Sequence, residues 1–280
     1  MRAIQKMVTI FLFIPYLVSC FGCTMGTSNV QEEPPLFPQE SIQERVLPNP
    51  KIGKADEFWD VSDIDISHVS HSRKLIALTF DDSPASTLQE IVGVYLRFNV
   101  EHPDAPASAT LFCNGRNVTE RTLPDLEMAY AVGFEFGNHT QNHKNLSVLS
   151  KSETKREIDL TDRILQKIDG KERHLLRTPY GSMNDSIRKV SRAPIVNWFV
   201  DTLDWTKISA ENIYNEVWTK KNSGVIVLMH DGYHNTVSAL KRLLPDLYDA
   251  GYQVVSVSQM AKAHGCNLRN GSVYTRARKQ

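Results

Sequence analysis

Short apolar runs alternate with longer amphipathic stretches from about residue 73 onward, and this alternation limits the folds that the chain can adopt. A repeated strand and helix predicts a mainly parallel sheet covered by helices. The predicted strands cover residues 75–80, 109–113, 134–137, 174–177, 195–200, 225–229 and 253–257. The predicted helices cover residues 88–98, 123–132, 151–168, 185–190, 210–220 and 237–250. Such an α/β sheet is either open and doubly wound or closed into a barrel.

Chemically capable side chains directly follow five of these strands. The carboxyl ends of parallel strands converge on one face, where sites are built, so we expect these side chains to lie together. They are Asp81 and Asp82 after the first strand, His139 and His143 after the third, Arg177 and Tyr180 after the fourth, Asp201, Asp204 and Trp205 after the fifth, and His230 and Asp231 after the sixth.

Three of these residues predict a metal site. Asp82, His139 and His143 offer one oxygen and two nitrogen ligands, a set that suits Zn²⁺ and leaves positions open for water. The same donors accept Co²⁺, Mn²⁺ or Ni²⁺. Thr140 stands where the zincin motif has its glutamate, so a base must come from elsewhere, and Asp81 is the neighbouring candidate. The alternative is that the paired acids cap a helix and both histidines are surface residues.

Five ordered motifs carry these residues. They are Thr79-Phe80-Asp81-Asp82, His139-Thr140-Gln141-Asn142-His143, Arg177-Thr178-Pro179-Tyr180, Asp201-Thr202-Leu203-Asp204-Trp205 and Leu228-Met229-His230. The set resembles the polysaccharide deacetylases with a NodB homology domain, carbohydrate esterase family 4, over residues 74–263. The resemblance implies an α/β fold of the distorted (β/α)7 barrel type. Two departures are Ser83, where glycine commonly follows the acidic pair, and a longer segment at residues 99–108, which we expect to reshape the rim of the groove.

The resemblance also implies catalytic roles. Asp81 would take a proton from the attacking water, and His230 would protonate the leaving amine as general acid. Arg177 would keep Asp81 ionised through a charge-assisted hydrogen bond. Asp204 would keep His230 in its charged imidazolium form through a second such hydrogen bond. The metal held by the Asp-His-His set would lower the pKa of its bound water and polarise the acetyl carbonyl.

Three further residues would contact the substrate on this resemblance. The backbone N–H of Tyr180 would stabilise the oxyanion, a task that leaves its side chain free to vary. Trp205 and Leu228 would wall the pocket that receives the acetyl methyl group. The alternative for Tyr180 is a turn residue after Pro179, and the alternative for Trp205 and Leu228 is core packing.

The first residues resemble a bacterial lipoprotein signal peptide. Arg2 and Lys6 precede an apolar run that ends in Leu17-Val18-Ser19-Cys20, similar to a lipobox. This run is too short to span roughly 30 Å of hydrocarbon, so no permanent transmembrane anchor is expected. Cleavage after residues 1–19 would leave Cys20 as the lipidated N-terminus and hold the protein on a membrane. An ordinary signal peptide cut nearby is the alternative.

The remaining chain divides by composition. Residues 20–72 form the lipidated N-terminus and a proline-rich tether, and the stretch around Phe58 and Trp59 is expected to pack on the domain. Residues 73–265 form the deacetylase-like domain, and residues 266–280 form a C-terminal tail. The 32 basic residues balance 32 acidic ones, which gives no electrostatic reason to expect a nucleic-acid partner.

These observations favour a metal-dependent hydrolase that removes N-acetyl groups from a polymer containing N-acetylglucosamine. Peptidoglycan is the natural candidate substrate, beside a chitin-like oligosaccharide, for an exported, membrane-tethered enzyme. Such an enzyme is expected in a bacterial cell envelope, at the outer membrane or periplasm if there are two membranes. An O-acetyl esterase acting on xylan or another acetylated polysaccharide is the second hypothesis. A carbohydrate-binding protein without turnover is the third.

Overall fold

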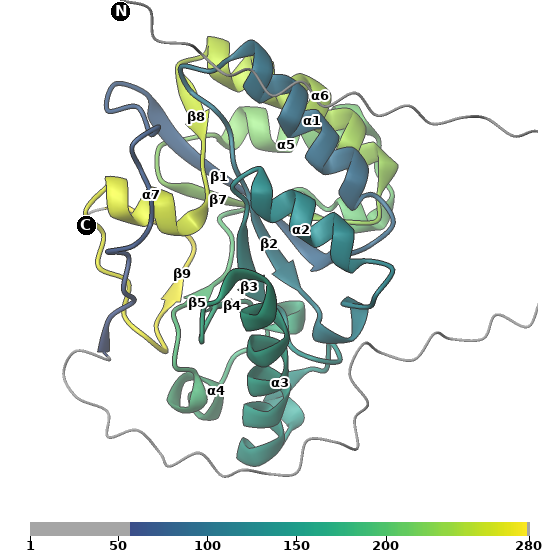
Figure 1. The fold of residues 1–280 in the computed structure, drawn as a ribbon, viewed down its shortest axis with the longest axis vertical. Coiled ribbons are helices and arrows are strands. Elements are labelled where there is room, and N and C mark those ends of the chain that lie inside the picture. Colours follow the sequence, from purple (N-terminus) through teal and green to yellow (C-terminus); the bar gives the residue numbers. More distant parts are fainter. Residues whose placement is uncertain (1–56, 279–280) are drawn as a thin grey trace, which may run out of the picture. The chain divides into compact units, whose positions relative to one another are not determined.

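The computed structural model describes residues 57–278, which form an α/β fold on one nine-stranded sheet (Figure 1). The strands are β1 (Lys74–Ser83), β2 (Thr110–Cys113), β3 (Glu135–Asn138), β4 (Leu175–Leu176), β5 (Ile195–Val196), β6 (Val200–Asp201), β7 (Val225–His230), β8 (Tyr252–Val254) and β9 (Val273–Tyr274). Their order is β6-β7-β1-β2-β3-β4-β5-β9, with β8 paired to the start of β1, and all these pairings are parallel. The predicted fold class is confirmed.

Of the helices in the described chain, the first six cover one face of this sheet and the seventh covers the other. They are α1 (Leu88–Glu101), α2 (Leu123–Ala131), α3 (Lys151–Asp169), α4 (Asp185–Val190), α5 (Ala210–Lys220), α6 (His234–Asp249) and α7 (Val257–Ala263). The first six contact one another in the order α5, α6, α1, α2, α3 and α4, which follows the strands around the sheet. Ile76, Leu78 and Phe80 alternate along β1 and pack under α1 and α6. Burying each such side chain stabilises the fold by roughly 1.5–3 kcal/mol.

The opposite face of the sheet is covered by α7 and by the segments at both ends of the described chain. Leu75 and Ala77, the alternate residues of β1, belong to this second core together with Met260, Val69 and Leu268. Figure 1 shows α7 on the side of the sheet away from α1 and α6. The interior of the curled sheet is therefore a packed core.

The single strand predicted over residues 195–200 is wrong. The structure has β5 and β6 there, and they lie near opposite ends of the strand order. On one side, Asn197 N–H donates to Tyr274 O (2.8 Å), whereas Phe199 N–H donates to Ile226 O on the other (2.9 Å). The chain thus passes from one end of the sheet to the other within a few residues, which brings the two ends together and curls the sheet.

Two elements near the C-terminal end were not predicted. The predicted strand at residues 253–257 ends at Val254, and α7 begins soon afterwards because Ser256 and Gln259 form a capping box. β9 pairs with β5, and beyond it Ala277 N–H donates to Gly224 O (2.9 Å). Residues 266–278, treated above as a tail, therefore extend the sheet and fill its interior.

The first residues of the described chain are joined to its last segment. Trp59 N–H donates to Leu268 O (2.7 Å), and Phe58 forms an antiparallel bridge with Arg269. The indole of Trp59 also donates to Ser258 Oγ (3.1 Å). The expectation that this aromatic stretch packs on the domain is confirmed.

The predicted signal peptide, the lipidation site at Cys20 and most of the predicted tether lie outside the described residues. None of the helices within residues 57–278 is both long enough and apolar enough to cross a membrane.

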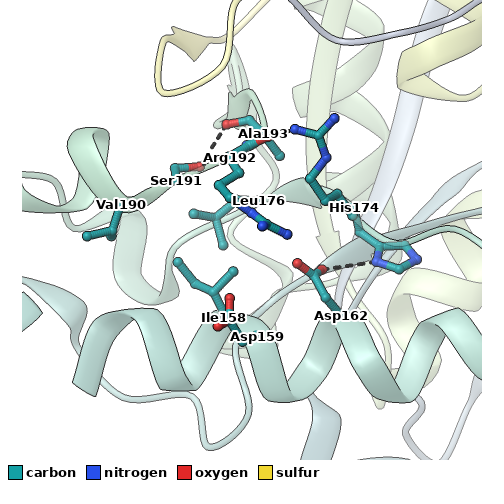
Figure 2. Close-up of a pocket in the computed structure, with 10 residues that line it drawn as sticks. Ile158, Asp159, Asp162, His174, Leu176, Val190, Ser191, Arg192 and Ala193 are labelled. Atoms are coloured by element: carbon teal, nitrogen blue, oxygen red, sulfur yellow. Dashed lines mark hydrogen bonds and ion pairs between the residues drawn. The ribbon is translucent and has the colours of Figure 1, made fainter. Parts of the chain in front are cut away.

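His174 directly precedes β4 and lies buried between two carboxylates. Its Nδ1 is 3.0 Å from Asp162 Oδ1, and its Nε2 is 3.2 Å from both carboxylate oxygens of Asp169. Figure 2 shows Asp162 on α3 directed at the imidazole, beside a cavity of about 10 Å³. Burial opposes the imidazolium, but the two acids outweigh it and raise the pKa of His174 to about 9. Asp162 also accepts Asn138 Nδ2–H (2.8 Å), which links this pair to the end of β3.

The contacts of His174 with Asp162 and Asp169 predict that the stability of the fold depends on pH. Because the pKa of His174 is raised from 6.5 to about 9, its contribution is fully present below pH 6.5 and is lost as the pH rises through about 9. The full size of this contribution is on the order of 3 kcal/mol in the free energy of unfolding. We expect urea titrations at several pH values to show this decline in the wild type and a flatter profile in His174→Gln. The exposed His71→Gln is the control, and an equal decline in all three proteins would contradict the assignment.

Candidate active site

The structure brings the predicted polar residues together at the carboxyl ends of the parallel strands. Asp81 of β1 and His230 of β7 are register partners on adjacent strands. His139 directly follows β3, and Arg177 directly follows β4. Asp204 starts the short 3-10 helix that follows β6. Residues far apart in sequence therefore meet because parallel strands present their ends at one edge.

Asp82, His139 and His143 form a compact donor cluster. Asp82 Oδ1 lies 3.5 Å from His143 Nε2 and 3.9 Å from His139 Nε2, and the three donor atoms all lie within 4.8 Å of one another. His139 is buried, whereas Asp82 and His143 are partly exposed. Within residues 57–278 this is the group of histidine, cysteine and acidic side chains that could hold a metal ion.

The hydrogen bonds around this cluster fit a metal ligand set. His139 Nδ1 lies 2.8 Å from Arg177 O, and a carbonyl can only accept, so Nδ1 carries a hydrogen and Nε2 is the ring nitrogen that faces the cluster. Asn114 Nδ2–H donates to Asp82 Oδ1 (2.9 Å) and orients that carboxylate. Burial and the neighbouring His139 lower the pKa of His143, which favours the neutral imidazole that a metal requires. The donors therefore suit Zn²⁺ or a similar divalent cation.

Asp81 is paired with a guanidinium that has no contact with solvent. Arg177 Nη1–H donates to Asp81 Oδ1 (2.8 Å), and Arg177 stacks on the ring of Phe112 at 4.0 Å. Burial favours the neutral acid, but Arg177, His139 and His230 outweigh it and lower the pKa of Asp81 below 3.8. The other oxygen, Oδ2, lies 3.6 Å from His139 Nε2. Asp81 is therefore an ionised carboxylate with one oxygen directed at the metal cluster.

His230 is paired with a second buried acid. Its Nδ1 lies 2.7 Å from Asp204 Oδ1, while Asp204 Oδ2 accepts the backbone N–H of His230 (2.8 Å) and the hydroxyl of Thr236 (2.7 Å). Burial favours the neutral ring, but the hydrogen bond to Asp204 and the charge of Asp81 raise the pKa of His230 above 6.5. This arrangement stabilises the imidazolium.

The three predicted substrate-contact residues differ in exposure. Tyr180 is 70% exposed, and its ring lies edge-on to His143 with centroids 4.9 Å apart. Trp205 is 51% exposed, beside Asp204 at the same edge of the sheet. Leu228 is only 3% exposed within β7, so most of its surface packs in the core. The two aromatic side chains are therefore free to contact a ligand.

Several site residues have a left-handed backbone. Asp82 has φ 66°, His143 has φ 54° and Tyr180 has φ 62°, and Thr140 and Leu203 are also positive. Such conformations cost roughly 1 kcal/mol or more for residues other than glycine and persist only where the surroundings hold them. Backbone strain is thus concentrated in the loops that carry the site.

Comparison with known proteins identifies the family. The family model "Polysaccharide deacetylase" matches residues 68–194. A peptidoglycan-N-acetylglucosamine deacetylase of Bacillus cereus is 35% identical over 204 residues, which cover 69% of this chain and 91% of that protein. The chain belongs to the polysaccharide deacetylase family.

Two further relatives show the breadth of the family. The peptidoglycan-N-acetylmuramic acid deacetylase PdaC of Bacillus subtilis is 33% identical over 69% of this chain. Its solved structure matches 70% of this chain and 93% of the solved chain with a TM-score of 0.64. A bifunctional xylanase/deacetylase of Pseudobutyrivibrio xylanivorans is 30% identical over 71% of this chain. The chain spans only 40% of PdaC and 32% of the bifunctional enzyme.

Sequence reasoning missed several residues that support the deacetylase site. Asn114 and Asn117 donate to Asp82 Oδ1 and Asp82 O, respectively (2.9 and 3.0 Å), and Thr236 donates to Asp204. Asn114 directly follows β2, so the rule that polar residues follow the strands would have found it. Thr236 lies on α6 and had no such signal.

Residues 99–108 do not reach the rim of the deacetylase site, so that expectation is wrong. They lead into the start of β2, whereas the site lies at the carboxyl ends of the strands. Their contacts are with β8: Ser108 N–H donates to Val254 O (3.1 Å), and Gln253 Nε2–H donates to Pro106 O (2.9 Å). Residues 99–108 therefore pack at the end of the strands that is opposite to the site.

The donor cluster predicts the effect of removing one ligand from the deacetylase. We expect His139→Ala and His143→Ala to weaken Zn²⁺ binding by more than about 100-fold, because losing only an outer partner of a ligand already costs 10–100-fold. The measurement is competition between the apoprotein and a chromogenic chelator. His71→Ala, an exposed histidine outside the cluster, is the control. Unchanged Zn²⁺ affinity in both ligand variants would exclude this cluster as the metal site.

Proposed function

We propose that this protein is a metal-dependent deacetylase that removes N-acetyl groups from a polysaccharide containing N-acetylglucosamine, with peptidoglycan as its substrate. The observation that carries the proposal is a pair of register partners with oppositely shifted pKa values beside a metal-binding cluster. The pKa of Asp81 is lowered, and that of His230 is raised. Neighbouring groups whose environments separate their pKa values are the pattern expected of an acid and a base.

The metal cluster and Asp81 serve the attack on the acetyl group. Asp82, His139 and His143 would hold a divalent cation, which would polarise the acetyl carbonyl as a Lewis acid and lower the pKa of a bound water. Asp81 is the general base. Arg177 holds its Oδ1, which leaves Oδ2 on the side of His139 to take the proton.

His230 serves the departure of the sugar amine. Its raised pKa favours the imidazolium, which can give its Nε2 proton to the leaving nitrogen. Asp204 holds the ring through Nδ1 and stabilises its positive charge. The same carboxylate accepts the His230 N–H, so ring and main chain are oriented by one group.

Three residues are proposed to bind the substrate. The backbone N–H of Tyr180 stabilises the developing oxyanion, and the left-handed turn at that residue sets the direction of the N–H. Trp205 offers an exposed aromatic face for the sugar and acetyl group. Leu228 contributes to the apolar floor of the acetyl pocket from β7, where it is also part of the core.

The substrate proposal is supported by what related proteins are named for. Two of the relatives described above act on peptidoglycan by name, and the Bacillus cereus protein is matched over 91% of its length. An acetylated xylan is the second candidate, because the Pseudobutyrivibrio relative is a xylanase/deacetylase. The paired base and acid favour turnover over a binding protein that lacks activity.

The membrane location is proposed from the N-terminal sequence. A lipid on Cys20, after removal of residues 1–19, would hold the catalytic domain at the membrane of the cell envelope, where peptidoglycan is within reach. Labelling with a radioactive fatty acid tests this proposal. Label in the wild type but not in Cys20→Ala would support it, and label in neither would refute it.

Acetate release tests the activity and the substrate together. The Zn²⁺-loaded protein is assayed on chitooligosaccharides, peptidoglycan and acetylated xylan in parallel. We expect acetate from the amino-sugar polymers, and a loss of about 10²–10⁴-fold in kcat/KM in Asp81→Asn, because the variant lacks the base. Asp246→Asn, on α6, is the matched control. Release from xylan alone would favour the esterase, and no release from any polymer by metal-loaded wild type would refute both enzyme proposals.

The His230–Asp204 pair predicts the alkaline limit of activity. Asp204→Asn removes the charge that raises the pKa of His230, so the imidazolium is lost at a lower pH. We expect the alkaline limb of the kcat/KM profile to move down by about 1 pH unit or more. Thr236→Val removes only a hydroxyl from the same carboxylate and is expected to leave the limb in place. An unshifted limb in Asp204→Asn would exclude His230 as the titrating acid.

A further inference from the structure

Asp231 lies directly after the proposed general acid and is only 2% exposed. Its carboxylate accepts four hydrogen bonds from the last residue of β1 and the loop that follows. Oδ1 accepts the backbone N–H of Thr87 (3.1 Å) and its hydroxyl (2.8 Å). Oδ2 accepts the N–H of Ala85 (2.7 Å) and the hydroxyl of Ser83 (3.3 Å). The buried side chain of Asp231, which directly follows β7, therefore holds residues 83–87 at the end of β1.

The held loop continues directly from the metal ligand Asp82. This residue has a left-handed backbone, with φ 66°, and is anchored on both sides. Before it, Asp81 O accepts Asp231 N–H (3.0 Å), and after it, Ser83 O accepts Asn114 N–H (2.9 Å). A strained residue keeps its conformation only while such anchors hold the chain.

We propose that Asp231 is a positioning residue for the metal site. Its carboxylate fixes the loop after β1, so that Asp82 keeps its left-handed backbone and its Oδ1 stays beside the two histidines. The inference rests on the metal site of the proposed function. It also gives a role to Ser83, whose hydroxyl adds a donor to Asp231 that glycine at this position would lack.

The test measures metal affinity in the absence of substrate. Each oxygen of Asp231 accepts two hydrogens, so in Asp231→Asn two donors lose their acceptor whichever oxygen becomes the amide nitrogen. We expect Zn²⁺ binding by the apoprotein, measured against a chromogenic chelator, to weaken about 10-fold or more. In the loaded enzyme, kcat should fall while KM changes little, because Asp231 holds a ligand and does not touch the substrate.

Matched variants separate positioning from a loss of fold stability. Asp246→Asn makes the same chemical change at a carboxylate that accepts the hydroxyl of Tyr214 (2.8 Å), away from the loop. Thr87→Val removes the hydroxyl that donates to Asp231 and accepts Gly232 N–H, and Thr87→Ser keeps it. If Asp231→Asn does not fold, the Thr87 pair carries the test alone.

Weaker Zn²⁺ binding in Asp231→Asn and Thr87→Val, with wild-type affinity in Asp246→Asn and Thr87→Ser, would support the inference. Wild-type Zn²⁺ affinity in Asp231→Asn, or an equal loss in Asp246→Asn, would overturn it. If only the Thr87 pair folds, equal affinities in its two members would overturn it. Because the titration needs no substrate, a wild type that binds Zn²⁺ but releases no acetate would refute the proposed function and leave this inference standing.

Discussion

The buried ion pair between Arg177 and Asp81 is the interaction on which the rest of the structure depends. A guanidinium with no solvent contact is tolerated only when its donors are satisfied. Besides Asp81, Arg177 donates to Thr79 Oγ1 and to the carbonyls of Val196 and Asn197. These bonds join β1 to the crossing between β5 and β6. The carbonyl of the same arginine fixes the tautomer of His139. One residue therefore links the curl of the sheet, the charge of the base and the orientation of a metal ligand.

The sequence allowed the meeting of these polar residues to be predicted better than the individual strands of the sheet. The site residues follow strands, and the geometry of parallel strands brings such residues together whatever the details of each strand. The split at residues 195–200 could not be seen, because it depends on Tyr274 and Ile226, which pair with this segment from far along the chain. Short elements such as β9 carry too few residues for a pattern. Supporting residues such as Thr236 become visible only once helices and strands are packed.

The proposed base and the proposed acid lie on two neighbouring strands, β1 and β7. Asp81 and His230 are register partners, yet each has its own buried counter-charge: Arg177 for the first and Asp204 for the second. Because each partner reaches the site from a different strand loop, the two pKa values can shift in opposite directions over a short distance.

The pairing of the first residues with the last segment has a topological consequence. Phe58 and Trp59 lie against Arg269 and Leu268, so the first residues of the described domain are held against its last segment. Proteins with adjacent ends tolerate circular permutation when the new ends fall in exposed loops. The order of the β/α units along the chain is thus separable from their order around the sheet. The site depends on the order of the strands around the sheet, and not on which strand comes first in the chain.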